Sequence, residues 1–114
     1  MIGQIYKSTN LINSKIYIGQ TKCIGLLNAR IKRHIKSCKS KITKNDYFHR
    51  AINKYGINNF KWEIIEEISD IKEKLFIILN NLEIFWIKKL NTQDPKIGYN
   101  LTPGVIHLLI LMGV

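Results

Sequence analysis

Glu83 is the residue whose position most strongly suggests chemistry, because it interrupts an apolar helical pattern. At 100° per residue, a helix through this region places five apolar side chains within about 60° of it: Phe76, Leu79, Trp86, Ile87 and Leu90. A carboxylate in such an arc is costly unless a cation pairs with it. Glu83 therefore predicts an ion pair with Arg30, a helix face that is not fully buried, or a carboxylate directed into a cleft to hold a divalent metal.

Basic and phenolic side chains occur at spacings that would allow them to bind an anion together. Arg30 and His34 lie four residues apart on the border of an apolar helical stripe. Tyr6 and Tyr17 each stand beside an isoleucine in a strand-like run, so antiparallel pairing would put both phenols on one face. Taken singly, such tyrosines usually serve packing, and a lone arginine is usually a salt-bridge residue. Only their joint occurrence indicates a site.

The basic charge is concentrated in the first half of the chain. The 114 residues carry a net charge of +10 and are 46% hydrophobic, which is enough for one folded domain. Residues 1–62 contain 13 Lys or Arg and one acid, whereas residues 63–114 contain 5 and 7. Between Lys22 and Lys44 there are eight basic residues and no acid. This stripe predicts a polyanionic partner, nucleic acid before an acidic membrane surface.

Several other classes of protein are disfavoured. Cys23 and Cys38 have no metal-site spacing, and without further ligands His34 and Cys38 do not indicate zinc. The start of the chain has no secretory pattern, so we expect an intracellular protein, in the cytoplasm or nucleus of a host cell. The apolar run 105–112 is shorter than the roughly 20 residues that cross a bilayer, so no stable membrane association is expected.

The chain begins with a predicted β-hairpin. Residues 3–7 and 15–19 are rich in Ile and Tyr, and Asn13-Ser14 is the candidate turn between them. A helix over residues 26–38 follows. Its apolar stripe consists of Leu27, Ile31, Ile35 and Cys38, with Lys32, Lys36 and Lys39 on the wet side.

The second half of the pattern is helix, strand, helix. Residues 46–55 predict a helix ended by Gly56, and residues 60–68 predict a strand with Phe60, Trp62 and Ile64 on one side. A last helix begins after Ser69 or Asp70 as N-cap, has Glu73 in its first turn, and runs to about Leu90. The order β-β-α-α-β-α predicts an α+β fold with a small three-stranded antiparallel sheet flanked by helices. His49, Trp62 and Trp86 are interpreted as packing residues.

Five groups of residues resemble, in order, the motifs of the GIY-YIG nuclease superfamily. They are Gly3-Gln4-Ile5-Tyr6 with Tyr17-Ile18-Gly19, Leu27-Asn28-Ala29-Arg30 with His34, Ala51-Ile52-Asn53-Lys54-Tyr55-Gly56 with Asn59-Phe60, Leu82-Glu83 with Trp86-Ile87, and Gly98-Tyr99-Asn100-Leu101 with Pro103-Gly104. The first group departs from the strict triplet, because Gln4 follows Gly3. The resemblance covers residues 1–104.

The resemblance implies metal-dependent hydrolysis of a DNA phosphodiester, most like the catalytic module of phage or viral homing endonucleases. Tyr6 and Tyr17 would sit at the attacking water and the scissile phosphate, one of them as general base. Arg30 would bind the phosphate, for which its planar guanidinium is suited. A tyrosine base would need nearby positive charge, because a free phenol has a pKa near 10.

The remaining site assignments also come from the resemblance. Glu83 would hold a single Mg²⁺, with Mn²⁺ as the other candidate, and His34 and Asn100 would position neighbouring groups. Six cations of the basic stripe are expected to grip DNA phosphates without reading sequence: Lys22, Lys32, Arg33, Lys36, Lys39 and Lys41.

The predicted organisation is a nuclease domain over residues 1–104 and an apolar tail over residues 105–114 that forms no separate domain. Sequence specificity is then expected to be poor, or to be supplied by a homodimer or a separate DNA-reading partner. Three other functions stay open. These are a structure-specific repair nuclease, a basic DNA-binding remnant that no longer cuts, and a membrane-surface protein using the basic helix and apolar tail.

Overall fold

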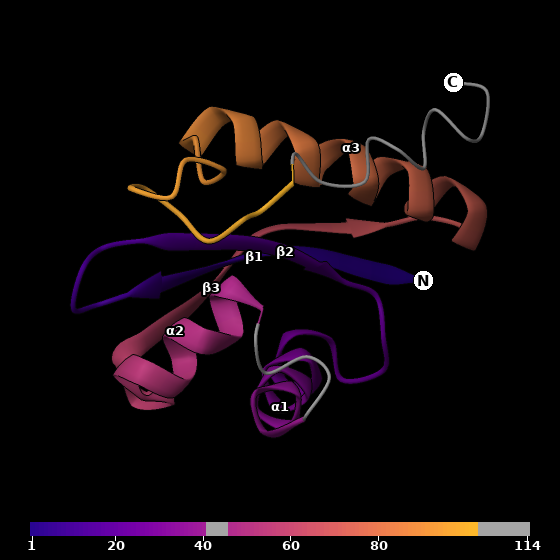
Figure 1. Cartoon of the computed structure of the whole chain (residues 1–114). Helices are drawn as coiled ribbons and strands as arrows, with labels where there is room; N and C mark the ends of the chain where they lie inside the picture. Colours follow the sequence, from indigo (N-terminus) through magenta and orange to yellow (C-terminus); the bar gives the residue numbers. More distant parts are fainter. Residues whose placement is uncertain (41–45, 103–114) are drawn as a thin grey trace.

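A three-stranded antiparallel sheet forms the middle layer of the molecule (Figure 1). The computed structural model describes residues 1–40 and 46–102. Strands β1 (Ile2–Asn10), β2 (Ile16–Thr21) and β3 (Phe60–Ser69) pair in the order β2-β1-β3. The predicted hairpin and third strand are therefore confirmed, with β1 as the central strand.

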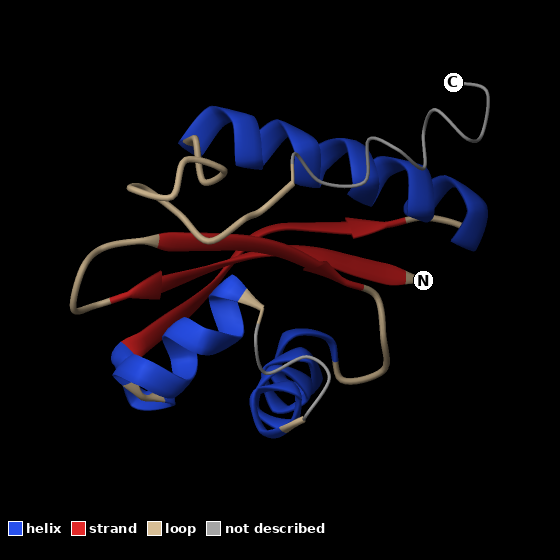
Figure 2. Cartoon of the chain, viewed as in Figure 1, coloured by secondary structure: helices blue, strands red, loops and turns tan. Residues whose placement is uncertain are grey.

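Helices cover both faces of this sheet (Figure 2). Helices α1 (Leu26–Lys39) and α2 (Tyr47–Tyr55) lie on one face, and α3 (Lys72–Leu90) lies on the other. A short 3-10 turn, η1 (Ile57–Asn59), links α2 to β3. Gly56 has φ 86°, which a side chain would strain, so it ends α2 as predicted. The predicted order and fold class are confirmed.

The hairpin register places the two motif tyrosines together. Tyr6 pairs with Gly19 and Ser8 pairs with Tyr17, so both phenols emerge on the face covered by α1 and α2. Their ring centroids lie 6.3 Å apart. The ring of Tyr6 occupies the space that a Cβ at Gly19 would need, so the glycine of the second motif makes room for the tyrosine of the first.

Two hydrophobic clusters hold the three layers together. One joins the sheet to α1 and α2 through Cys38, Phe48, Ala51, Ile52, Phe60 and Tyr99. The other joins the sheet to α3 through Ile5, Ile18, Leu75, Leu79 and Ile87. Because successive side chains of a strand point to opposite faces, Ile5 belongs to the cluster on the α3 side, whereas the Tyr6 ring lies against Tyr17, His34 and Trp62 on the other side.

The predicted side of β3 is confirmed up to a bulge. Phe60, Trp62 and Ile64 pair with Asn10, Ser8 and Tyr6, so they share one side as expected, although Ile64 is half exposed. The register against β1 then shifts between Tyr6 and Ile5, which face Ile64 and Glu66, so Ile65 is the extra residue, and it packs toward α3. Periodicity alone cannot show the residue at which the alternation slips.

Two helix predictions also shift in detail. The buried side of α1 consists of Leu27, His34 and Cys38, whereas Ile31 and Ile35 are only half-buried. His34 thus belongs to the core-facing side rather than to its border. Helix α3 begins after Ile71 rather than after Ser69 or Asp70, and the Asp70 carboxylate accepts from the Ile71 amide, one residue before the helix.

Part of the sequence interpretation lies outside the described residues. This applies to Lys41, to the closing Pro103-Gly104 and to the apolar tail. None of the described helices is long and apolar enough to cross a membrane.

Candidate active site

A cavity of about 360 Å³ opens where β2, one of the two outer strands of the sheet, meets the surrounding helices. Tyr17 enters it from β2, Arg30 and His34 from α1, and Glu83 from α3. The N-terminal end of α2 and the segment after α3 complete the wall with Asp46, Tyr47, Phe48, His49, Tyr99, Asn100, Leu101 and Thr102. Five of the six predicted site residues therefore line one cavity, although they come from four separate parts of the chain.

The sixth residue, Tyr6, lies behind this wall. Its side chain is 0% exposed, whereas Tyr17 is half-buried and stacks flat on Phe48 at a centroid distance of 4.0 Å. Burial, together with the Tyr17 phenol, raises the pKa of Tyr6 far above its ordinary value. Burial and then the Glu83 carboxylate raise the pKa of Tyr17 to about 12. Both residues are therefore neutral phenols at pH 7 in the chain as it stands.

A line of four polar side chains runs from Tyr6 to the surface at Asp46. The Tyr6 hydroxyl lies 2.7 Å from Nε2 of His34, and Nδ1 of His34 lies 2.9 Å from Nε2 of His49. Nδ1 of His49 lies 3.5 Å from the Asp46 carboxylate. Burial, and next the Arg30 guanidinium, lower the pKa of His34 to about 3, so this ring is neutral.

One arrangement of protons satisfies the whole line. The Asp46 carboxylate only accepts, so a proton on Nδ1 of His49 faces it and Nε2 of His49 accepts. His34 then donates from Nδ1 to His49 and accepts at Nε2 from the Tyr6 hydroxyl. Asp46 thereby sets the direction in which the buried Tyr6 hydroxyl points, through two histidines.

Arg30 brings positive charge to the cavity wall. Its guanidinium lies close enough to the Tyr6 hydroxyl to favour the ionised phenol and lower its pKa, although burial outweighs this effect. Its Nε is buried and has no hydrogen-bond partner among the described residues. A buried unpaired donor costs free energy, which an anion bound in the cavity could recover.

The carboxylate of Glu83 is directed into the cavity rather than into packed hydrocarbon. Burial raises its pKa, while the Gln20 amide and the Arg30 guanidinium favour the ionised form. Gln20 in turn donates to the buried Asn80, at 2.9 Å, which fixes its position beside Glu83. Within the described residues Glu83 forms no ion pair, so the predicted pairing with Arg30 at salt-bridge distance is not formed.

The donor set fits a hard divalent cation. Mg²⁺ binds carboxylate oxygen and commonly keeps several waters, so one carboxylate facing a wet cavity suffices. The described residues contain no group of three His, Cys, Asp or Glu side chains that could enclose a metal. A site here therefore depends on Glu83 together with water and substrate oxygens.

Asn100 makes three hydrogen bonds that explain its place beside Tyr17. Its Oδ1 accepts from the Ile18 amide and from the Thr92 hydroxyl, both at 2.9 Å, and its Nδ2 donates to the Ile18 carbonyl, also at 2.9 Å. The Asn100 side chain thus connects Ile18, the residue after Tyr17, with the segment after α3. Its geometry is that of a positioning residue.

Two of the cations predicted to bind DNA phosphates, Lys22 and Arg33, line a recess beside the cavity. Lys32, Arg33, Lys36 and Lys39 are exposed on α1, and within the described residues none of them forms an ion pair. Arg33 shares a recess of about 350 Å³ with Gln20, Thr21, Lys22, Cys23 and Arg30. Since Arg30 lines this recess and the cavity, the two adjoin.

Sequence reasoning missed three residues of the site. His49 was interpreted as packing, yet it lines the cavity and contacts His34. Asp46 and Gln20 were given no site role. Asp46 is the one acid among the first 62 residues, which was a usable signal. Gln20 carried no such signal, because its role depends on contacts with Glu83 and Asn80, which lie about 60 positions away in the sequence.

Comparison with known families agrees with this geometry. The model of the GIY-YIG catalytic domain matches residues 2–100. The protein segD of Enterobacteria phage T4, named as a candidate endonuclease, is 33% identical over 106 residues, covering 91% of this chain and 42% of that protein. The uncharacterized protein 019R of Invertebrate iridescent virus 6 is 30% identical over 99 residues, covering 87% and 33%. The chain thus spans less than half the length of either relative.

Solved structures show the same fold. A mutant of the catalytic domain of the intron endonuclease I-TevI superposes with a TM-score of 0.71 at 33% identity, covering 91% of this chain and 97% of that one. The catalytic domain of the homing endonuclease I-TevI gives 0.64 at 34% identity, covering 88% and 98%.

Proposed function

The chain belongs to the GIY-YIG catalytic domain family and is an endonuclease domain of that family, and from this premise we propose that it hydrolyses a DNA phosphodiester in the cavity between β2, α1 and α3. The observation that supports this is the convergence of Tyr17, Arg30, His34 and Glu83 on one hollow of about 360 Å³. A phenol can orient the nucleophile, a guanidinium can bind the phosphate, and a carboxylate can bind a metal.

In this proposal Arg30 binds the scissile phosphate. Arg30 lines the cavity, and its planar guanidinium can offer a fork of donors to two phosphoryl oxygens. Negative charge grows on those oxygens as the attacking water bonds to phosphorus and the bond to the leaving oxygen breaks. A fixed cation at this place stabilises that charge more than the charge of the bound substrate.

Tyr17 is the tyrosine that contacts the attacking water. It lines the cavity, whereas Tyr6 is fully enclosed. The Tyr17 hydroxyl orients the water, and its stacking on Phe48 fixes the ring. Tyr6 acts through its neighbours as a positioning residue, because its hydroxyl is hydrogen-bonded to His34 and lies close to Arg30.

Glu83 would hold the divalent metal, for which we propose Mg²⁺ or Mn²⁺. GIY-YIG nucleases generally depend on a divalent metal. When bound, the ion supplies charge stabilisation at the phosphoryl group. The contribution of the chain is to keep Glu83 ionised, which Gln20 and Arg30 favour.

Nicking of supercoiled plasmid in the presence of Mg²⁺ tests the proposal. We expect the wild-type chain to nick, and Glu83→Gln and Tyr17→Phe to lose at least about 10²-fold in rate. Glu73→Gln is the matched control, because Glu73 is an exposed carboxylate on the same helix. Equal nicking by wild type and by both site variants, with folding verified by circular dichroism, would contradict the proposal.

A further inference from the structure

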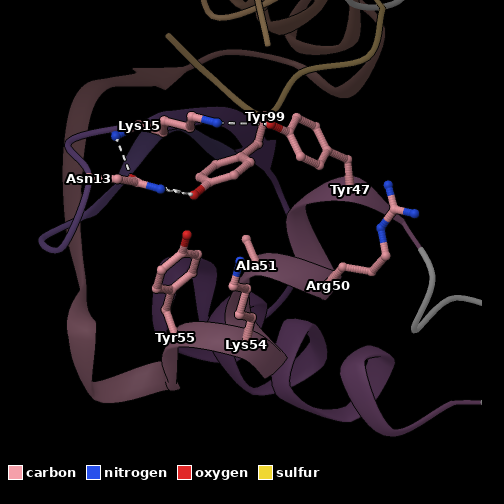
Figure 3. Close-up of a pocket in the computed structure, with 8 residues that line it drawn as sticks. All are labelled: Asn13, Lys15, Tyr47, Arg50, Ala51, Lys54, Tyr55 and Tyr99. Carbon is pink, nitrogen blue, oxygen red and sulfur yellow. Dashed lines mark hydrogen bonds between the residues drawn. The ribbon is translucent and has the colours of Figure 1, made fainter. Parts of the chain in front are cut away.

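A second hollow, of about 290 Å³, lies between α2 and the β1–β2 turn (Figure 3). One face of α2 supplies Tyr47, Arg50, Ala51, Lys54 and Tyr55, which follow the i, i+3, i+4, i+7, i+8 spacing. Asn13 and Lys15 come from the hairpin, and Tyr99 comes from the segment after α3. We call it the tyrosine pocket.

The tyrosine pocket is positively charged. Lys15, Arg50 and Lys54 line it, and its lining contains no Asp or Glu. Within the described residues none of these three cations forms an ion pair. Uncompensated cations around a hollow attract an anion, and phosphate is the anion that a nuclease domain meets.

Two aromatic rings of the tyrosine pocket, those of Tyr47 and Tyr99, are held in place by hydrogen bonds. The Tyr99 hydroxyl accepts from the amides of Asn10 and Asn13, at 3.0 and 3.2 Å. The Tyr47 hydroxyl donates to the carbonyl of Pro95 and accepts from the Lys15 ammonium, both at 3.1 Å. Such rings give a base or sugar a rigid apolar surface at little cost in entropy.

The tyrosine pocket adjoins the active-site cavity. Tyr47 and Tyr99 line both hollows, so a strand leaving the cavity on this side reaches the pocket directly. The recess containing Lys22 and Arg33 adjoins the cavity through Arg30 instead. Cationic surfaces therefore border the cavity through two different walls.

We propose that the tyrosine pocket binds one nucleotide of the DNA strand next to the scissile phosphate, its phosphate against Lys15, Arg50 and Lys54 and its base or sugar against the tyrosine rings. This rests on the proposed function, because it places a neighbouring part of the same substrate. The volume lies at the small end of ligand sites, about 300–1,000 Å³, and suits a single nucleotide. Stacking on aromatic rings requires a nucleotide turned out of the duplex or in an unpaired strand.

Titration followed by NMR tests the pocket without any cutting. The isotopically labelled chain is kept in EDTA and receives a thymidine dinucleotide with a 5′ phosphate, thymidine alone, or inorganic phosphate. We expect the dinucleotide to shift the Ala51 amide and the rings of Tyr47 and Tyr55, and to bind at least tenfold more tightly than either fragment. Shifts confined to Arg30 and Tyr17, or equal binding of inorganic phosphate, would overturn the proposal.

Paired variants separate charge from stacking. Lys54→Ala should weaken dinucleotide binding and lower the slope of log affinity against log salt concentration by about one. Lys74 is an exposed lysine on α3, and Lys74→Ala should change neither the affinity nor the slope. Tyr55→Leu should weaken binding by about tenfold, and Tyr55→Phe, which keeps the ring, should not. Unaltered affinity in both Lys54→Ala and Tyr55→Leu would overturn the assignment.

The same variants distinguish this proposal from the proposed function. If wild type nicks plasmid DNA and Lys54→Ala shows an unchanged KM, the pocket proposal fails and the nuclease proposal stands. If the chain binds the dinucleotide at the pocket but nicks no DNA with any divalent metal, the nuclease proposal fails and the binding site stands.

Discussion

The molecule uses tyrosine in two regions that differ in their surroundings. In the enclosed region, Tyr6 is fully buried with its hydroxyl against His34, Tyr17 is half-buried and stacked on Phe48, and the pKa values of both phenols are raised. In the tyrosine pocket, the rings of Tyr47 and Tyr55 are half-buried beside three cations.

The difference separates two tasks that a nuclease has to perform. A buried neutral network defines geometry, and a loss of that geometry affects the rate of reaction. A wet cationic surface supplies affinity that falls with salt. Changes in the first region should therefore alter kcat, and changes in the second should alter KM and its salt dependence.

The largest effect is expected from Arg30→Ala in the enclosed region. It removes the cation at the phosphate and should lower the nicking rate about 10³-fold, or about 4 kcal/mol. Arg30→Lys should recover little, because an ammonium lacks the planar fork. Single-turnover nicking at saturating protein measures the rate. A tenfold or smaller loss in Arg30→Ala would contradict the role given to this residue.

The next effect concerns the space that Tyr6 occupies. Gly19→Ala places a methyl group where the Tyr6 ring lies, so the free energy of unfolding should fall by about 1–3 kcal/mol and nicking should be lost. Urea unfolding gives the first value. Adding Tyr6→Leu should restore part of the stability but no activity, since the two positions are coupled. Stability equal to wild type in the single variant would show that the ring can move away.

Acid should destabilise the enclosed region through His34. In the folded chain the pKa of His34 is near 3, below the ordinary 6.5. At pH values between 3 and 6.5 the unfolded chain therefore binds a proton at His34 that the folded chain does not bind. The contribution of His34 to stability is complete above pH 6.5 and is lost at roughly 1.4 kcal/mol per pH unit below it. Urea unfolding at pH 7 and pH 5 should differ by about 2 kcal/mol. In His34→Gln this pH dependence should largely disappear, and an unchanged slope would contradict the assignment.

The smallest effect is expected at the tyrosine pocket. Arg50→Ala should raise KM for plasmid nicking by a few fold at about 0.15 M salt and leave kcat unchanged. Lys88→Ala, on the exposed surface of α3, is the control. A fall in kcat without a change in KM would remove the distinction between the two regions.

The fold could be predicted because it follows from local patterns, whereas most of the site came from the resemblance of five residue groups to the GIY-YIG superfamily. Alternating residues define the hairpin, and the apolar arc around Glu83 already indicated an unusual carboxylate. The bulge at Ile65 could not be predicted, because it depends on how β3 meets β1. His49 was missed since its partner His34 lies on another helix, and only tertiary packing brings the two rings within 2.9 Å.

The charge interpretation was similarly incomplete. The basic stripe between Lys22 and Lys44 indicated α1, and of its described cations Arg30 lines the cavity while Lys22 and Arg33 line the recess next to it. Lys15, Arg50 and Lys54 lie outside that stripe and are distant in sequence from each other, so no local run of charge marked them. Their shared hollow exists only because the hairpin turn lies against one face of α2.

The hydrogen bonds of Asn100 have a consequence for how copies of this chain behave toward one another. Strand β2 is one of the two outer strands of the sheet, and an outer strand with free amides and carbonyls is a template for pairing with another molecule. Here the amide and carbonyl of Ile16 bond to Ile97 and Tyr99, and those of Ile18 bond to the Asn100 side chain. One asparagine thus completes the cover over an isoleucine-rich strand, and a chain ending before Tyr99 would offer that strand for intermolecular β-sheet growth.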